Sequence, residues 1–162
     1  MGHSSLDQNS LEQNAAVGEA APVAPAADTS QIRVLLVEDE ALIAEIIGET
    51  LAEHGYAVHA VSNALDALAH LSAGSRVDVL FTDINLPGDI DGAHLADMVR
   101  DIHPGLPVIY ASGRWARLDE LRNVPRSAIL QKPYSPARAC SAVERLVGAL
   151  PAAANSEMAL PL

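Results

Sequence analysis

Five polar residues that follow short apolar stretches could together carry chemistry. They are Glu38, Asp39, Asp83, Ser112 and Lys132. Three carboxylates repel one another unless a cation lies between them, and a hard divalent ion such as Mg2+ accepts carboxylate, carbonyl and water oxygens. One screened carboxylate can then attack a phosphorus atom, because metal, hydroxyl and ammonium neutralise the phosphoryl oxygens. The set predicts a magnesium-dependent site for phosphoryl transfer.

The elements that must position these residues alternate along the chain. Apolar runs of strand length are followed by patterns of helical spacing, which predicts strand–helix units on a parallel sheet. We expect five strands, at residues 32–37, 56–61, 77–82, 108–111 and 128–131. The fold class is therefore α/β, a doubly wound five-stranded parallel sheet with helices on both faces.

Two helices have distinctive sequence signals. The fourth has only Leu118 and Leu121 as strong apolar anchors between Arg114 and Val124, so we expect it to be short or irregular. The last begins at Ser135-Pro136, a natural cap and first helical position. Asp89, Asp91 and Gly92 are interpreted as loop and cap of the third helix.

The predicted sheet explains how distant polar residues meet. In a doubly wound sheet the carboxyl ends of the strands share one edge, where such folds bind ligands. The two acids follow the first strand, Asp83 the third, Ser112 the fourth and Lys132 the fifth. All five are therefore expected on one rim.

Composition divides the chain into three parts. Residues 1–30 are rich in Gln, Asn, Ser, Ala and Pro and have little to bury, so we interpret them as a disordered N-terminal segment, a linker or an expression scar. Residues 31–150 form the folded unit, and residues 151–162 are expected to be a flexible tail.

Charge and hydropathy exclude several functions. The formal net charge is -11 and no concentrated basic patch is visible, which argues against direct nucleic-acid binding. No apolar run is long enough to cross a bilayer, and the start lacks the features of a signal peptide. We expect a cytoplasmic protein without a membrane role.

Four segments resemble the motifs of one family, in that family's order. They are Leu35-Leu36-Val37-Glu38-Asp39-Glu40, Leu80-Phe81-Thr82-Asp83-Ile84-Asn85-Leu86-Pro87-Gly88, Ser112-Gly113 and Lys132-Pro133. Together they are similar to the receiver domains of two-component response regulators over the whole folded unit. The resemblance implies a flavodoxin-like (CheY-like) sheet of order 2-1-3-4-5.

The resemblance also implies roles for the acids. Asp83 would be the phosphoacceptor of a phosphorelay, taking its phosphoryl group from a histidine kinase or phosphotransfer protein. Asp39 and, directly or through water, Glu38 would hold Mg2+ with Asp83 and the main-chain carbonyl of Asn85. The chain would then catalyse its own phosphorylation and dephosphorylation while acting mainly as a switch of protein contacts.

The remaining motifs imply how the switch works. Lys132 would contact the phosphoryl group, aimed inward by a cis bond to Pro133. Ser112 would swing toward the phosphoryl oxygen and donate a hydrogen bond, moving the loop after the fourth strand.

Two features depart from the commonest receiver pattern. Ile129 stands where many receivers place a rotating Tyr or Phe, which argues against aromatic-rotamer coupling. The segment 110–114, Tyr-Ala-Ser-Gly-Arg, is similar to the Phe-Ala-Thr-Gly variant of a subfamily with an atypical fourth helix. Arg114 and Asn85 would flank the path of attacking water and tune the phosphoryl lifetime.

Simpler interpretations and other functions remain open. Acids after a strand also favour a helix N-terminus, and Asp83 could be a turn residue. The chain is expected to be a stand-alone receiver with an unknown downstream protein partner. Alternatives are the C-terminal receiver of a hybrid histidine kinase and a receiver-like binding module that takes no phosphate. A dimer through the fourth helix and fifth strand is also conceivable.

Overall fold

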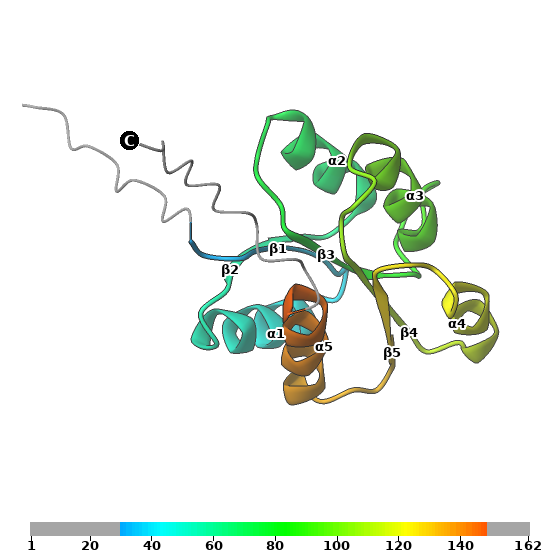
Figure 1. Cartoon of the computed structure of the whole chain (residues 1–162). Helices are drawn as coiled ribbons and strands as arrows, with labels where there is room; N and C mark the ends of the chain where they lie inside the picture. The colour runs from blue at the N-terminus through cyan, green and yellow to red at the C-terminus, as the bar shows by residue number, and fades with distance from the viewer. Residues whose placement is uncertain (1–29, 149–162) are drawn as a thin grey trace, which may run out of the picture.

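The structure, a computed structural model, describes residues 30–148. The predicted tails, 1–30 and 151–162, lie outside the described residues except for Ser30. Five strands alternate with five helices in chain order, and Figure 1 labels them: β1 Arg33–Val37, α1 Ala41–Glu53, β2 Ala57–Val61, α2 Ala64–Ser72, β3 Val79–Asp83, α3 Gly92–Ile102, β4 Val108–Ser112, α4 Trp115–Leu121, β5 Ser127–Gln131 and α5 Pro136–Gly148.

The five strands form one parallel sheet. Their spatial order is β2-β1-β3-β4-β5, which confirms the predicted doubly wound topology. The three inner strands are mostly apolar, and all their residues except Arg33 are buried, as expected for central strands of a parallel sheet. The two edge strands are only partly buried.

Helices cover both faces of the sheet. Figure 1 shows α1 and α5 together on one face and α2 and α3 on the other, with α4 beside β4 and β5. Alternate residues of each strand pack into two separate cores, because successive side chains point to opposite faces. In β3, Leu80 belongs to the core under α2 and α3, whereas Phe81 belongs to the core under α1 and α5.

Short polar caps fix where helices begin near the rim. The side chain of Asn63 accepts a hydrogen bond of 2.9 Å from the main-chain nitrogen of Asp66, at the start of α2. Asp91 caps α3 in the same way, accepting from His94 at 2.8 Å. The predicted capping role of Asp91 is confirmed.

Strand ends differ by one or two residues from the prediction, and one difference matters. Asp83 is the last residue of β3 rather than the first residue beyond it. It is in register with Ala111 of β4, and the next main-chain nitrogen, that of Ile84, donates to the Ala111 carbonyl at 2.9 Å. The main chain of Asp83 is therefore fixed by the sheet.

Helix α4 is short, as its sparse apolar pattern indicated. It has seven residues and no side-chain cap at its start. Leu118 is fully buried under it, and Leu121 packs against the same core. This helix begins three residues after Ser112, so its position depends on the loop that follows β4.

Candidate active site

Three residues from different strand ends meet at the carboxyl edge of the sheet. The Lys132 ammonium donates hydrogen bonds of 2.5 Å to Asp83 Oδ2 and 3.0 Å to Glu38 Oε2. Lys132 lies 49 residues from Asp83 and 94 from Glu38 along the chain. The parallel sheet therefore assembles the group that the sequence predicted on one rim.

The acids of this rim form a compact cluster. One carboxylate oxygen from each of Glu38, Asp39 and Asp83 lies within 4.8 Å of the others. Glu38 and Asp83 are buried, whereas Asp39 is exposed at the mouth of the site. Oxygen donors at this spacing suit a hard divalent cation, and an exposed side leaves room for its water ligands.

Burial and the hydrogen bonds of Lys132 shift the pKa values of the site in opposite directions. Burial raises the pKa of Glu38, although its hydrogen bonds with Lys132 and the main chain of Glu40 oppose the rise. Burial also disfavours the Lys132 ammonium, yet hydrogen bonds to Asp83 and Glu38 more than compensate and raise the pKa of Lys132. Lys132 is thus held protonated and partly neutralises the acid cluster.

The Asp83 carboxylate is held from both sides. Its Oδ1 accepts from the main-chain nitrogen of Asn85 at 2.8 Å, while Oδ2 is bound by Lys132. The Asn85 side chain itself is exposed. These contacts present the carboxylate in one orientation at the rim.

The main chain of Asp83 also touches the start of α3. A Cβ atom added to Gly92 would lie 1.9 Å from the Asp83 carbonyl oxygen and 2.7 Å from Thr82 Oγ1. The Gly92 nitrogen donates to the Ile84 carbonyl at 2.9 Å. Sequence reasoning assigned Gly92 only to the loop and cap, because no local signal shows this approach.

Ser112 occupies the end of β4 and is fully buried. Its hydroxyl accepts a 3.1 Å hydrogen bond from the Arg114 nitrogen, and its carbonyl accepts one of 2.9 Å from the Lys132 nitrogen. The Lys132–Pro133 peptide bond is cis. The loops after β4 and β5 are therefore joined by main-chain contacts directly beside the acids.

Two further predicted residues lie farther from the carboxylates. Arg114 is exposed, and its main chain rather than its side chain contacts Ser112. Ile129 is half-buried on β5 and packs against the core that includes Tyr110. Within residues 30–148, neither side chain forms a hydrogen bond or an ion pair with Asp83.

Tyr134 is a residue of the site that sequence reasoning missed. It follows the cis bond by one residue, and its ring lies 6.1 Å from that of Phe81, measured between centroids. Burial, together with the charge of Glu38, raises the pKa of Tyr134 to about 12. Tyr134 lines a pocket together with Lys132 and Pro133. An aromatic residue directly after Lys132-Pro133 was the only sequence signal that could have found it.

Comparison with known proteins supplies the family. The family model of the response regulator receiver domain matches residues 34–144, most of the chain. The chain belongs to this receiver family. Receiver domains act in two-component signalling, where they interact with histidine kinases and downstream effectors. They generally bind Mg2+ at an acidic pocket, and this structure has an acid cluster at the rim of its sheet.

Relatives and solved structures agree with this assignment. The transcriptional regulatory protein CreB of Escherichia coli is 35% identical over 117 residues, covering 70% of this chain and 50% of CreB. The sensor kinase CckA of Brucella abortus is 32% identical over 118 residues, covering 70% of this chain and 12% of CckA. The crystal structure of a Sinorhizobium medicae response regulator receiver protein has a TM-score of 0.68 and 35% identity, covering 74% of this chain and 97% of that one.

The chain spans only part of the length of the curated relatives that it matches. It covers 50% of CreB and 12% of CckA. Within residues 30–148, no helix is long and apolar enough to cross a membrane.

Proposed function

We propose that this receiver domain accepts a phosphoryl group on Asp83 from the phosphohistidine of a histidine kinase or phosphotransfer protein. The observation that carries the proposal is the Asp83 carboxylate, bound by Lys132 at 2.5 Å beside two further acids. No structural task of a strand end requires three clustered acids, two of them in contact with a half-buried ammonium. The predicted set of residues fits one task, phosphoryl transfer.

The transfer needs only groups at the rim. An oxygen of Asp83 forms a bond to phosphorus as the phosphorus–nitrogen bond to the donor imidazole breaks, and the imidazole nitrogen takes up a proton from solvent. Before transfer, the Lys132 ammonium neutralises the Asp83 carboxylate. During transfer, it contacts the negatively charged phosphoryl oxygens instead. Ser112 donates its hydroxyl hydrogen to another phosphoryl oxygen and no longer accepts the hydrogen bond from the Arg114 nitrogen.

Magnesium completes the site. Asp39, Glu38 and Asp83 would hold it, with the Asn85 carbonyl as a fourth protein ligand, and the ion would supply positive charge for the incoming phosphoryl group. The exposed position of Asp39 gives the metal an entry path from solvent. The remaining ligands would be water.

The direct test is the intact mass of the full chain after incubation with acetyl phosphate or beryllofluoride and Mg2+. We expect an adduct in the wild type and none in Asp83→Asn or without magnesium. Glu45→Gln, an exposed acid on α1, is the control with the same loss of charge. Failure of the wild type to form an adduct with any donor would instead favour the binding module that takes no phosphate.

Metal binding is tested separately by thermal unfolding. Because a ligand that binds only the folded state stabilises it, Mg2+ at about 100 times its Kd should raise the melting temperature by about 5–10 °C. Asp39→Asn should lose most of this rise. Asp89→Asn, an exposed acid in the loop between β3 and α3, should keep it; equal responses in both variants would exclude the proposed ligand set.

A second arrangement of the same function rests on one observation. The match to the sensor kinase CckA shows that this kind of domain also occurs within kinases. The chain would then be the C-terminal receiver of a hybrid histidine kinase. It would take its phosphoryl group from a phosphohistidine in the same polypeptide. The length of the native open reading frame distinguishes this arrangement from a stand-alone receiver.

A further inference from the structure

Two histidine rings meet beside the edge strand β2, which lies at the opposite end of the sheet from β5. The rings of His59 and His70 are stacked, with centroids 3.8 Å apart and an angle of 11° between their planes. We call these two residues the histidine pair. They are eleven positions apart in the sequence, which is not a usual spacing of metal ligands, so only the fold brings them together.

A strand and a helix hold the pair in place. His59 is in the middle of β2, and it points to the same face of the sheet as Val61, which packs against the core under α2 and α3. His70 is in the last turn of α2. Both main chains therefore belong to regular elements, which position ligands more precisely than loops do.

The ring nitrogens of the pair are available for a ligand. Within residues 30–148, the only histidine ring that forms a hydrogen bond is that of His54, so the rings of His59 and His70 form none. Burial and then the charge of His59 lower the pKa of His70. His70 is therefore neutral at neutral pH, and the neutral imidazole is the form that binds metal ions.

The surroundings of the pair favour a cation. A groove of about 740 Å3 connects the pair with the rim of the sheet. Its lining includes the two histidines and four acids, Glu38, Asp39, Glu45 and Asp66, and among the described residues no Lys or Arg lines it. A cleft lined by one sign of charge raises the local concentration of the opposite charge.

The chemistry of the donors selects the kind of cation. Imidazole nitrogen suits Zn2+, Cu2+ and Ni2+, whereas Mg2+ prefers oxygen ligands, so the pair and the acid cluster differ in the ion that they favour. Two nitrogens bound to one tetrahedral Zn2+ lie about 3.3 Å apart, close to the ring separation of the pair. The ring lone pairs lie in the ring planes, so the rings must tilt toward the ion. His59 is exposed and has room to tilt.

We propose that His59 and His70 bind a divalent transition metal ion, Zn2+ in the first place, at a site separate from the magnesium site. Water fills the remaining positions of the ion. Asp66 lies one helical turn before His70, and its Oδ2 accepts from the Asn63 side chain at 2.8 Å, so its Oδ1 is the atom that accepts a hydrogen bond from one of these waters. The ion links the edge strand to α2, and its binding requires no phosphoryl group on Asp83.

The test is calorimetric titration of the full chain with Zn2+ at pH 7.5, with excess Mg2+ present to fill the acid cluster. We expect Zn2+ to bind the wild type. His59→Gln and His70→Gln should each weaken this binding at least about tenfold, since loss of even an outer-shell partner of a metal site has an effect of this size. His103→Gln, which removes an exposed imidazole directly after α3, should bind Zn2+ as the wild type does.

Nuclear magnetic resonance locates the ion and checks the fold of each variant in the same sample. Zn2+ added in the presence of Mg2+ should shift the ring signals of His59 and His70 and leave those of His103 unchanged. Because His59 is exposed, the metal-free amide spectrum of His59→Gln should match that of the wild type. Wild-type affinity for Zn2+ in His59→Gln would overturn the proposal. So would Zn2+ shifts at Asp83 and Lys132 with unchanged signals from the histidine pair, because the ion would then have replaced Mg2+ at the acid cluster.

Discussion

At the scale of single residues, the closest approach in the site is that of Gly92 to the Asp83 main chain. Because the added Cβ of Gly92→Ala would lie 1.9 Å from a carbonyl oxygen that is fixed in the sheet, the start of α3 or the end of β3 must shift. We expect the free energy of unfolding to fall by about 2 kcal/mol, as for overpacking in a core. Chemical denaturation measures it.

Phosphorylation provides a second readout for the same substitution. A shift of the β3 end moves the Asp83 carboxylate away from Lys132, so adduct formation with acetyl phosphate should slow in Gly92→Ala. Gly148→Ala is the control, since a Cβ there meets nothing within 4 Å. If Gly92→Ala matched this control in both stability and phosphorylation, the close contact would have no functional consequence.

Two exposed residues are expected to set the lifetime of the phosphoryl group. Asn85 lies two residues after Asp83, and Arg114 lies two residues after Ser112. Asp83 and Ser112 both take part in the proposed mechanism. Replacing both with alanine should open the path of attacking water and speed dephosphorylation roughly fivefold, which is about 1 kcal/mol in the barrier. The rate is measured as loss of the Asp83 adduct after the donor is removed.

The control for this prediction is Asn123→Ala, an exposed asparagine in the turn after α4. It should hydrolyse its phosphoryl group at the wild-type rate. An unchanged rate in the alanine variants of both Asn85 and Arg114 would show that these side chains do not limit access of water.

At the scale of elements, α4 is the helix with the fewest anchors. Arg117 of α4 donates to Asp91 at 2.5 Å, and Asp91 is the cap of α3. The pair joins α4 to the loop that leads from Asp83 to α3. Both side chains are about 40% exposed, so the pair contributes at most about 1 kcal/mol.

We therefore expect Arg117→Gln to loosen α4 without unfolding the domain. Amide hydrogen exchange of residues 117–121 should rise roughly two- to fivefold, whereas exchange in β1 and β3 should not change. Arg122→Gln is the matched control, because among the described residues Arg122 forms an ion pair only with Asp119, near the end of the same helix. Equal exchange in the two variants would mean that the contact with α3 does not hold α4.

At the scale of the whole molecule, every helix and strand that the structure describes lies within residues 30–148. The match to the receiver family, residues 34–144, lies inside the same range. Residues 1–30 and 151–162 are predicted from composition to add little to the core. A chain trimmed to residues 31–150 should thus unfold within about 2 °C of the full chain and form the same phosphoryl adduct. Calorimetry and intact mass measure both; a large loss of stability would show that a terminal segment packs on the domain.

The sequence by itself determined the sheet and the identity of the residues on its rim. Apolar runs of strand length fixed the number of strands, and the parallel arrangement placed Glu38, Asp39, Asp83 and Lys132 at one edge. This worked because the carboxyl ends of parallel strands always share an edge, so residue spacing is enough to predict proximity.

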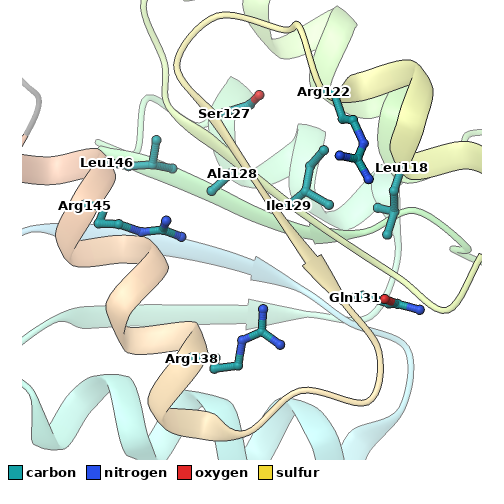
Figure 2. Close-up of a pocket in the computed structure, with 9 residues that line it drawn as sticks. All are labelled: Leu118, Arg122, Ser127, Ala128, Ile129, Gln131, Arg138, Arg145 and Leu146. Atoms are coloured by element: carbon teal, nitrogen blue, oxygen red, sulfur yellow. The ribbon is translucent and has the colours of Figure 1, made fainter. Parts of the chain in front are cut away.

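Only the tertiary structure decided contacts between elements that lack such a rule. The approach of Gly92 to Asp83 depends on how α3 lies on the sheet, and the sequence gives no measure of that distance. The sequence likewise showed no basic patch, because Arg122, Arg138 and Arg145 are separated along the chain. They meet only where α4 and α5 pack on either side of an edge strand (Figure 2), a geometry set by side-chain packing rather than by local pattern.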